Sequence, residues 1–182
     1  MRKILVFTLF TVILILLGCT DQEKTRCDVM LEVELKDMDS YINLALGLPP
    51  AFTTMNVNSY PKNPNAALSD NQNVEVDAIV TRWSRADGGT ITPKDFVLKW
   101  FIVIPAGGSA KLEGAYAMAW EQLYDMPFSQ LLPENGGVDS ETGNTIIVCT
   151  AEVTIYGHTL NGCDIASEHA TATFQFYYSG GR

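Results

Sequence analysis

Hydrophobic and polar residues alternate along most of the second half of the chain and in one segment near its beginning. Residues 29–35 place apolar side chains on one face and Glu32 and Glu34 on the other, which predicts a half-buried strand. The same alternation predicts three further strands, over residues 74–83, 144–156 and 170–178. The side chains expected to face inward along these three strands are Val74, Val76, Ala78, Val80, Ile147, Cys149, Ala151, Val153, Ile155, Ala170, Ala172, Phe174, Phe176 and Tyr178.

A nearly uninterrupted apolar segment, residues 96–104, has Trp100 at its centre. Because a strand without a polar face must be covered on both sides, we expect this one to be buried, with Trp100 in the core. Residues 112–124 fit both the alternation of a strand and the spacing of a helix. The glycine before the aromatic residues and the surrounding β pattern favour a strand through Trp120, followed by a helical turn.

Two segments lack the alternation of a strand. Residues 39–48 predict a short helix with Asp39 or Ser40 as its N-cap, ending near Gly47 before two prolines. Residues 52–73 are rich in Asn, Pro, Ser and Thr, which predicts a long, irregular surface connection.

The first nineteen residues have the order of a signal peptide. Arg2 and Lys3 precede an apolar run over residues 4–17, and the segment ends in Leu-Leu-Gly-Cys at Cys19. A transmembrane anchor is the alternative interpretation. Spanning a bilayer takes roughly 20 apolar residues, so this shorter run favours the signal peptide.

The Leu-Leu-Gly-Cys sequence resembles the lipobox of bacterial lipoproteins. This resemblance implies that signal peptidase II cuts before Cys19 and that Cys19 becomes a lipid-modified N-terminus. In enterobacterial lipoproteins an Asp after the cysteine favours the inner membrane, whereas Thr20 in this position favours the outer membrane. We therefore expect an envelope protein attached by its lipid, on a periplasmic or surface side left open. The expected organisation is a signal peptide over 1–18, an acylated cysteine and polar tether over 19–28, and a single β-sandwich domain over 29–182.

The charge of the chain excludes one class of partner. Its formal charge is −9, and removing residues 1–18 takes away Arg2 and Lys3 and makes it −11. Such a surface repels nucleic acid and anionic lipid headgroups. We expect no nucleic-acid partner, and we expect membrane contact through the lipid alone.

Several short strands, turns between them and no sustained helical period favour a mainly β, two-sheet sandwich. Trp100 in an apolar strand and the inward-facing Cys149 some fifty residues later resemble the strand C tryptophan and strand F cysteine of immunoglobulin-type domains. The resemblance covers residues 74–178 and implies an Ig-like antiparallel sandwich. It departs at residues 76–80, where no cysteine occurs, so the inter-sheet disulfide of that family is absent.

Lipid modification of Cys19 would leave three thiols in an oxidising compartment, where we expect one disulfide and one free cysteine. In an Ig-type sandwich the first strand can run parallel to the last. Cys27 precedes the first predicted strand and Cys163 precedes the last, so the resemblance implies a Cys27–Cys163 disulfide. Cys149 is then expected as a buried free thiol.

Few residues could hold a metal ion. His158 and His169 are too few for a Cu/Zn-type site, and we expect both in loops or at strand edges, with no cofactor. An acidic, glycine-bearing segment contains Glu134, Asp139 and Glu141, whose oxygens are candidate calcium ligands. The alternative is a solvated acidic connection.

Aromatic residues are a third kind of candidate. Trp83, Trp100 and Trp120 could stack on sugars, although aromatic residues at strand positions are more often part of the core. Tyr177 lies on the face opposite Phe176, where we expect it to be exposed.

The lipobox, the sandwich pattern and the lack of a reactive cluster favour a non-catalytic, lipid-anchored protein that binds or scaffolds other envelope proteins. Two alternatives stay open. One is an envelope hydrolase or carbohydrate-active protein that uses Asp125, Glu134, Asp139 and Glu141. The other is a subunit of a secretion or surface-appendage assembly that contributes a sheet edge.

Overall fold

The computed structural model describes residues 27–180, which form strands and short 3₁₀ turns without an α-helix. The strands are β1 (Val29–Met38), β2 (Tyr41–Asn43), β3 (Ala51–Pro61), β4 (Val74–Arg85), β5 (Phe96–Ile104), β6 (Ser109–Tyr116), β7 (Ile146–Thr159), β8 (Asp164–Ala166) and β9 (Ala170–Tyr177). The turns are η1 (Leu44–Leu46), η2 (Asp70–Gln72), η3 (Trp120–Tyr124), η4 (Phe128–Leu131) and η5 (Pro133–Asn135). Within this range no helix has the length and apolar character needed to cross a membrane. The expected signal peptide, Cys19 and most of the tether lie outside the described residues.

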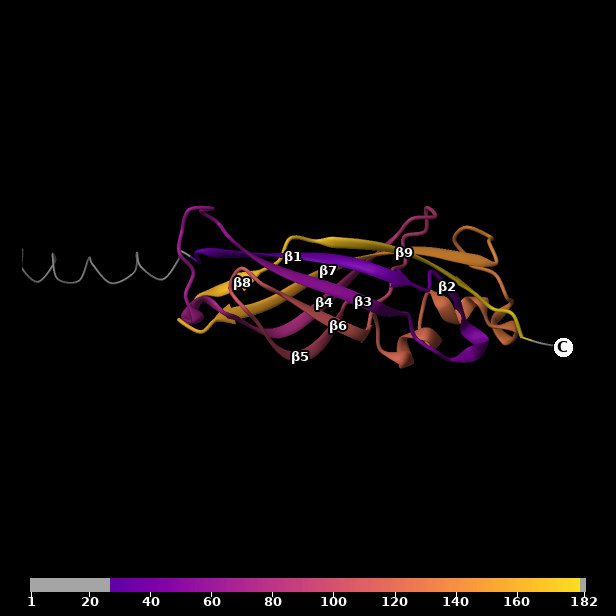
Figure 1. Cartoon of the computed structure of the whole chain (residues 1–182). Helices are drawn as coiled ribbons and strands as arrows, with labels where there is room; N and C mark the ends of the chain where they lie inside the picture. Colours follow the sequence, from indigo (N-terminus) through magenta and orange to yellow (C-terminus); the bar gives the residue numbers. More distant parts are fainter. Residues whose placement is uncertain (1–26, 181–182) are drawn as a thin grey trace, which may run out of the picture.

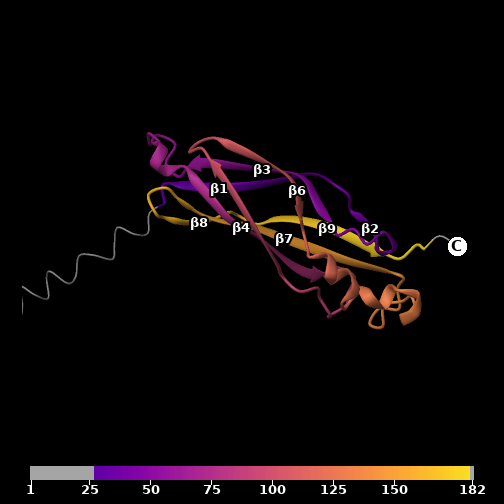
Figure 2. The same ribbon diagram turned by 90° about the horizontal axis from the view of Figure 1, so that it is seen from below.

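Two sheets pack face to face in a sandwich-like fold (Figures 1 and 2). The first sheet has the order β1-β3-β6. The second has the order β2-β9-β7-β4-β5, and β8 pairs with the end of β7. All pairings are antiparallel except that of β2 with β9, which is parallel. The prediction of a mainly β, two-sheet fold is confirmed, and the closer likeness to immunoglobulin domains stays a prediction.

The centre of the first sheet is β3, so the expectation of a surface connection over residues 52–73 is wrong for the first half of that segment. Phe52, Met55 and Val57 are buried, and Val57 lies opposite Val33 of β1. The Asn and Thr residues between them face away from the core. The strand has a polar outer face, which gives the whole segment the composition of a loop.

A β-bulge in β4 decides which of its side chains enter the core. The register with both neighbouring strands shifts between Val76 and Ala78. After the shift Ile79 and Trp83 are buried, and Val80, which uninterrupted alternation places inward, is only half-buried. One extra residue exchanges the two faces of a strand, and the sequence pattern does not show where it is inserted.

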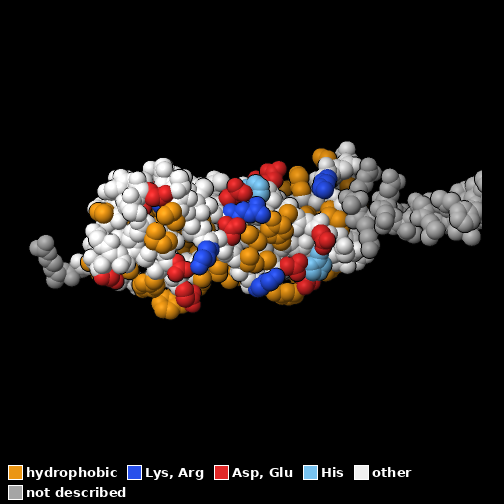
Figure 3. Space-filling view, turned by 180° about the vertical axis from the view of Figure 1, so that it is seen from behind, with side chains coloured by type: hydrophobic (Ala, Val, Ile, Leu, Met, Phe, Trp, Pro, Cys, Tyr) orange, Lys and Arg blue, Asp and Glu red, His pale blue; other side chains and the backbone are white. Residues whose placement is uncertain are grey.

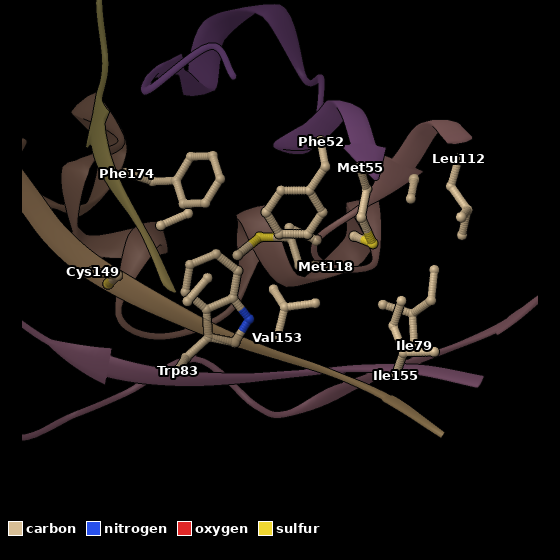
Figure 4. Packing of buried hydrophobic residues seen from close by; sticks show 14 of the residues in the cluster. Phe52, Met55, Ile79, Trp83, Leu112, Met118, Cys149, Val153, Ile155 and Phe174 are labelled. Atoms are coloured by element: carbon tan, nitrogen blue, oxygen red, sulfur yellow. The ribbon is translucent and has the colours of Figure 1, made fainter. Parts of the chain in front are cut away.

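Trp83 is the tryptophan at the centre of the core. It is 7% exposed, and its ring centroid lies 5.7 Å from that of Phe174 and 6.1 Å from that of Phe176. Figure 4 shows its indole near Phe174, which in turn lies edge to face against Phe52 with ring centroids 6.1 Å apart. Trp100, expected in the core, is half-buried at the margin because β5 is the outermost strand of its sheet. The expectation that β5 is covered on both faces is also wrong, because no described segment packs on its outer face, where Val97, Phe101 and Val103 are exposed.

Two ambiguous segments end in 3₁₀ turns. Residues 39–48 form β2 and η1, and Gly47 in the left-handed conformation ends the turn, so the expected helix is shorter and tighter than the pattern suggests. In residues 112–124 the strand ends at Tyr116, earlier than the expected Trp120, and the expected helical turn follows as η3.

Candidate functional site

A buried arginine joins the loops at one end of the second sheet. Arg85 is the last residue of β4, and its side chain is 1% exposed. Its guanidinium donates to Asp87 (Nε to Oδ1, 2.7 Å) and to Asp139 (Nη2 to Oδ2, 2.8 Å). Nη1 donates to the carbonyl of Ile91 and lies 3.7 Å from the Glu141 carboxylate. These contacts connect the segment after β4 with the segment before β7.

The calcium candidates are engaged by this arginine. Asp139 is buried and accepts hydrogen bonds from Arg85 and from the backbone and hydroxyl of Thr142. Glu141 accepts two backbone N–H groups of the β4–β5 connection, and Glu134 is exposed. Within residues 27–180 no three His, Cys, Asp or Glu side chains are grouped as metal ligands. The guanidinium supplies the positive charge that the calcium hypothesis assigned to an ion, so this geometry does not support that hypothesis.

The same hydrogen bonds keep the buried carboxylates ionised. Burial raises the pKa of Asp139, but the donors of Thr142 and Arg85 outweigh it and hold that pKa below its usual range. Burial also raises the pKa of Asp87, and the Arg85 guanidinium and the Val148 backbone N–H reverse the direction. The cluster is therefore charged at neutral pH, and its role is to hold the loops together.

The carboxylates of the hydrolase hypothesis have separate partners. Asp125 forms an exposed ion pair with Lys94 (3.0 Å), whereas Asp139 and Glu141 contact Arg85. A glycosidase needs an acid and a second carboxylate facing one substrate across a cleft. Three of the four candidates instead face a cation of the protein itself.

Both histidines lie beside carboxylates near the outer face of the second sheet. His158 on β7 is 3.0 Å from Asp77, and the hydrogen bond to that carboxylate raises the pKa of the imidazole. His169 contacts the hydroxyl of Thr154 (2.8 Å) and lies 3.5 Å from Glu152. His169 directly precedes β9, as expected, whereas His158 lies within β7 and pairs with Glu75 of β4 and Asp164 of β8. Each histidine has a structural partner.

Cys27 and Cys163 form the expected disulfide, with a Cα–Cα distance of 5.7 Å. Cys163 precedes β8, the short strand beside β7, and not the last strand. The bridge therefore ties the start of the first sheet to the end of β7 in the second. Cys149 is a buried free thiol whose pKa burial raises to about 12, so it is unreactive.

Replacing both Cys27 and Cys163 by serine should lower the free energy of unfolding by about 2 to 4 kcal/mol. The disulfide joins residues separated by 136 positions, so its loss greatly increases the entropy of the unfolded chain. Urea denaturation without reductant measures the change, and reductant should have the same effect on the wild type. A double variant as stable as the wild type would contradict this role.

Large apolar side chains are exposed together at the end of the sandwich opposite Cys27. In Figures 1 and 2, β2 and the turns after β6 lie at one end of the molecule and the start of β1 at the other. We define the distal apolar surface by six exposed residues at this end: Leu46, Leu48, Tyr116, Trp120, Tyr124 and Met126.

Contacts between two segments make this surface continuous. The rings of Trp120 and Tyr124 meet edge to face, with centroids 5.8 Å apart. Gly47 has a φ of +63°, and a Cβ there would lie 2.9 Å from the Tyr124 hydroxyl, so both conformation and space require glycine. Tyr116 pairs with Ala51 across β3 and β6. The turn after β2 and the turn after β6 therefore form one surface.

A shallow hollow of about 220 Å³ lies beside this surface. Its apolar walls come from Tyr41, Ile42, Leu46, Leu48, Pro49 and Pro50, and Asp39 and Asn43 supply polar atoms. Of this surface, the sequence pattern indicates Trp120 but not Leu46 and Leu48, which lie in the segment expected to form a short helix. The only local feature that could have indicated their exposure is that Leu46 and Leu48 lie on either side of the turn glycine, Gly47. Tyr177, expected to be exposed, is half-buried.

A comparison with models of known protein families finds no match, and a comparison with curated proteins finds none either.

Proposed function

We propose that this protein is a non-catalytic, lipid-anchored protein of the bacterial cell envelope that binds another envelope protein through the distal apolar surface. The observation that carries the proposal is the position of that surface, at the end of the domain opposite Cys27. Cys27 follows the proposed lipid site, Cys19, by only eight residues.

The length of the strands sets the distance between the two ends. The longest strand, β7, has 14 residues and spans about 45 Å at roughly 3.3 Å per residue. A lipid on Cys19 would keep the Cys27 end near the membrane. The distal apolar surface would then project away from it, where another protein can reach it.

The composition of the surface supports a protein partner. Leu48 is 66% exposed and Trp120 is 54% exposed, so both leave apolar area in water. Soluble monomers rarely expose a continuous apolar patch larger than a few hundred Å², and patches above that size mark interaction sites. Trp, Tyr and Met are enriched in protein interfaces, and Trp and Tyr bury a large area with little loss of conformational freedom.

Fatty-acid labelling of growing cells tests the anchor. The wild-type protein should take up the label and sediment with membranes, and Cys19→Ala should lose the label or accumulate as an uncleaved precursor. Cys27→Ser is the matched control, because it changes the next cysteine and should retain the label. If the wild type remains unlabelled, the lipid anchor is wrong.

Site-specific photo-crosslinking in cells tests the binding surface. A photoreactive residue at Leu48 should crosslink to a discrete envelope protein, and Trp120→Asp should reduce that product strongly. The control carries the photoreactive residue in place of Thr173, which is exposed on β9 away from the distal apolar surface. Equal products from both positions, or none from Leu48, would contradict the proposed role.

A further inference from the structure

The second sheet ends in a strand whose sequence is typical of a buried one. Eight of the nine residues of β5 are apolar, yet β5 pairs only with β4 and its other edge carries no strand. On the outer face Phe101 is 73% exposed, and Val97 and Val103 are exposed beside it. On the inner face Trp100 is only half-buried. Both faces of β5 are therefore incompletely covered.

The other sheet edges have the usual protection against pairing. β1 places Glu32, Glu34 and Lys36 along its outer face, and β6 carries Lys111 and Glu113. β2 has only three residues. Charged side chains and short length keep edge strands from pairing with other chains. β5 has nine residues and a single charge, Lys99, and so lacks this protection.

Figure 3 shows the outer face of the second sheet. The two pale blue groups are the two histidines of the chain, and hydrophobic side chains gather near them in the middle of the molecule. Charged groups of both signs lie beside the hydrophobic area. Val97, Phe101 and Val103 on the outer face of β5 are exposed, so none of the described segments covers that face.

We propose that the free edge of β5 accepts an extended segment of another protein as an additional antiparallel strand. The segment has an acidic residue opposite Lys99 and apolar residues on its other face, opposite Leu98, Trp100 and Ile102. Backbone hydrogen bonds supply the pairing, and side chains at alternate positions supply the specificity.

The positive charge of Lys99 determines where the partner segment has its acidic residue. Lys36, Lys94 and Lys111 each have an ion-pair partner, whereas Lys62 and Lys99 have none within residues 27–180, and of these two only Lys99 lies on β5. A carboxylate directly across the strand pair would provide one, and opposite charges at such positions stabilise strand pairing. Apolar residues on the other face of the segment would complete the cover of Trp100.

A second copy of this chain fits the edge less well. Antiparallel pairing of two β5 strands over their whole length centres on Trp100 and places Lys99 opposite the second copy's Phe101, with no acid available. This antiparallel pairing also makes the two copies point in opposite directions along the strands. The second copy's Cys27 end would then lie about 45 Å along the strands, beyond the roughly 27 Å reach of eight tether residues. This last step rests on the proposed lipid anchor.

The chain itself contains a segment with the required pattern, which provides a probe. A capped synthetic peptide of residues 29–35, Val-Met-Leu-Glu-Val-Glu-Leu, can place Val33 opposite Trp100 and Glu34 opposite Lys99. Added to the full chain in detergent, it should slow amide hydrogen exchange across β5. A peptide with lysine at both glutamate positions should bind about fivefold more weakly at low salt.

Charge reversal supplies the matched control. Lys99→Glu should reverse the preference and bind the lysine peptide better, and Phe101→Asp should weaken both peptides; Lys99 and Phe101 are exposed, so both variants should fold. No protection of β5, or a preference unchanged in Lys99→Glu, overturns the proposal. If the wild-type protein sediments as a dimer and Phe101→Asp sediments as a monomer, the strand that pairs with β5 comes from a second copy of this chain, and the proposal is wrong. The peptide needs no lipid, so its result is independent of the labelling experiment.

Discussion

Replacing Arg85 by alanine is expected to lower the free energy of unfolding by about 3 to 5 kcal/mol. The substitution leaves Asp87 and Asp139 ionised in buried positions without their cation, and the cost of an unpaired buried charge exceeds that of a lost surface contact. The segments after β4 and before β7 should also become accessible to proteases, because the guanidinium is their common contact. Urea denaturation and limited proteolysis measure the two effects.

Arg82→Ala is the control for this variant. Arg82 lies on the same strand, is exposed and is 3.9 Å from Asp95, so its loss should cost at most about 1 kcal/mol. Equal costs for the two variants would mean that the Arg85 cluster does not stabilise the fold.

The cluster also predicts the response to acid. The pKa values of Asp87 and Asp139 in the folded protein lie below the ordinary value of 3.8. Their ionised carboxylates therefore stabilise the fold above pH 3.8, and this stabilisation is lost as the pH falls through the folded pKa values. Wild-type stability should therefore fall below about pH 4, and more steeply than that of Arg85→Met.

Replacing Trp83 by alanine should also cost about 3 to 5 kcal/mol, because it removes the largest aromatic group of the core. Trp83→Phe should cost less. It keeps a ring against Phe174 and removes an indole N–H that is buried without a partner among the described residues. Chemical denaturation of the variants gives the comparison.

Trp100→Ala is the matched control, and it should cost clearly less than Trp83→Ala. Trp100 is half-buried at the margin of the core, so truncation removes less packing and leaves a space that water can enter. A greater loss from Trp100 than from Trp83 would mean that β5 is not an outer strand.

Local alternation was sufficient to predict four strands and most of their inward faces. In β7 every residue expected inside, from Ile147 to Ile155 at alternate positions, is buried. Alternation failed at β4, where the bulge between Val76 and Ala78 exchanges the faces of the strand. Amino-acid composition led to the wrong prediction for β3, because a strand with one polar face is as rich in Asn, Ser and Thr as a loop.

The candidate sites depended on contacts between distant residues. Arg85 meets Asp139 across a separation of 54 positions, and the distal apolar surface joins the turn after β2 to the turn after β6. No local pattern shows that an acidic loop will receive an arginine instead of an ion. The exposure of Phe101 likewise depends on which segments pack on the outer face of the second sheet, and none of the described ones covers it.

The sequence by itself determined the strand periodicity, the overall class of the fold, the acidic charge and the signal-like beginning of the chain, because each is a property of neighbouring residues or of composition. Only the tertiary structure decided which tryptophan enters the core, which strand is left at an edge and which turns meet. Those outcomes follow from the pairing order of strands far apart in the chain, and burial and hydrogen bonding over the whole domain select that order.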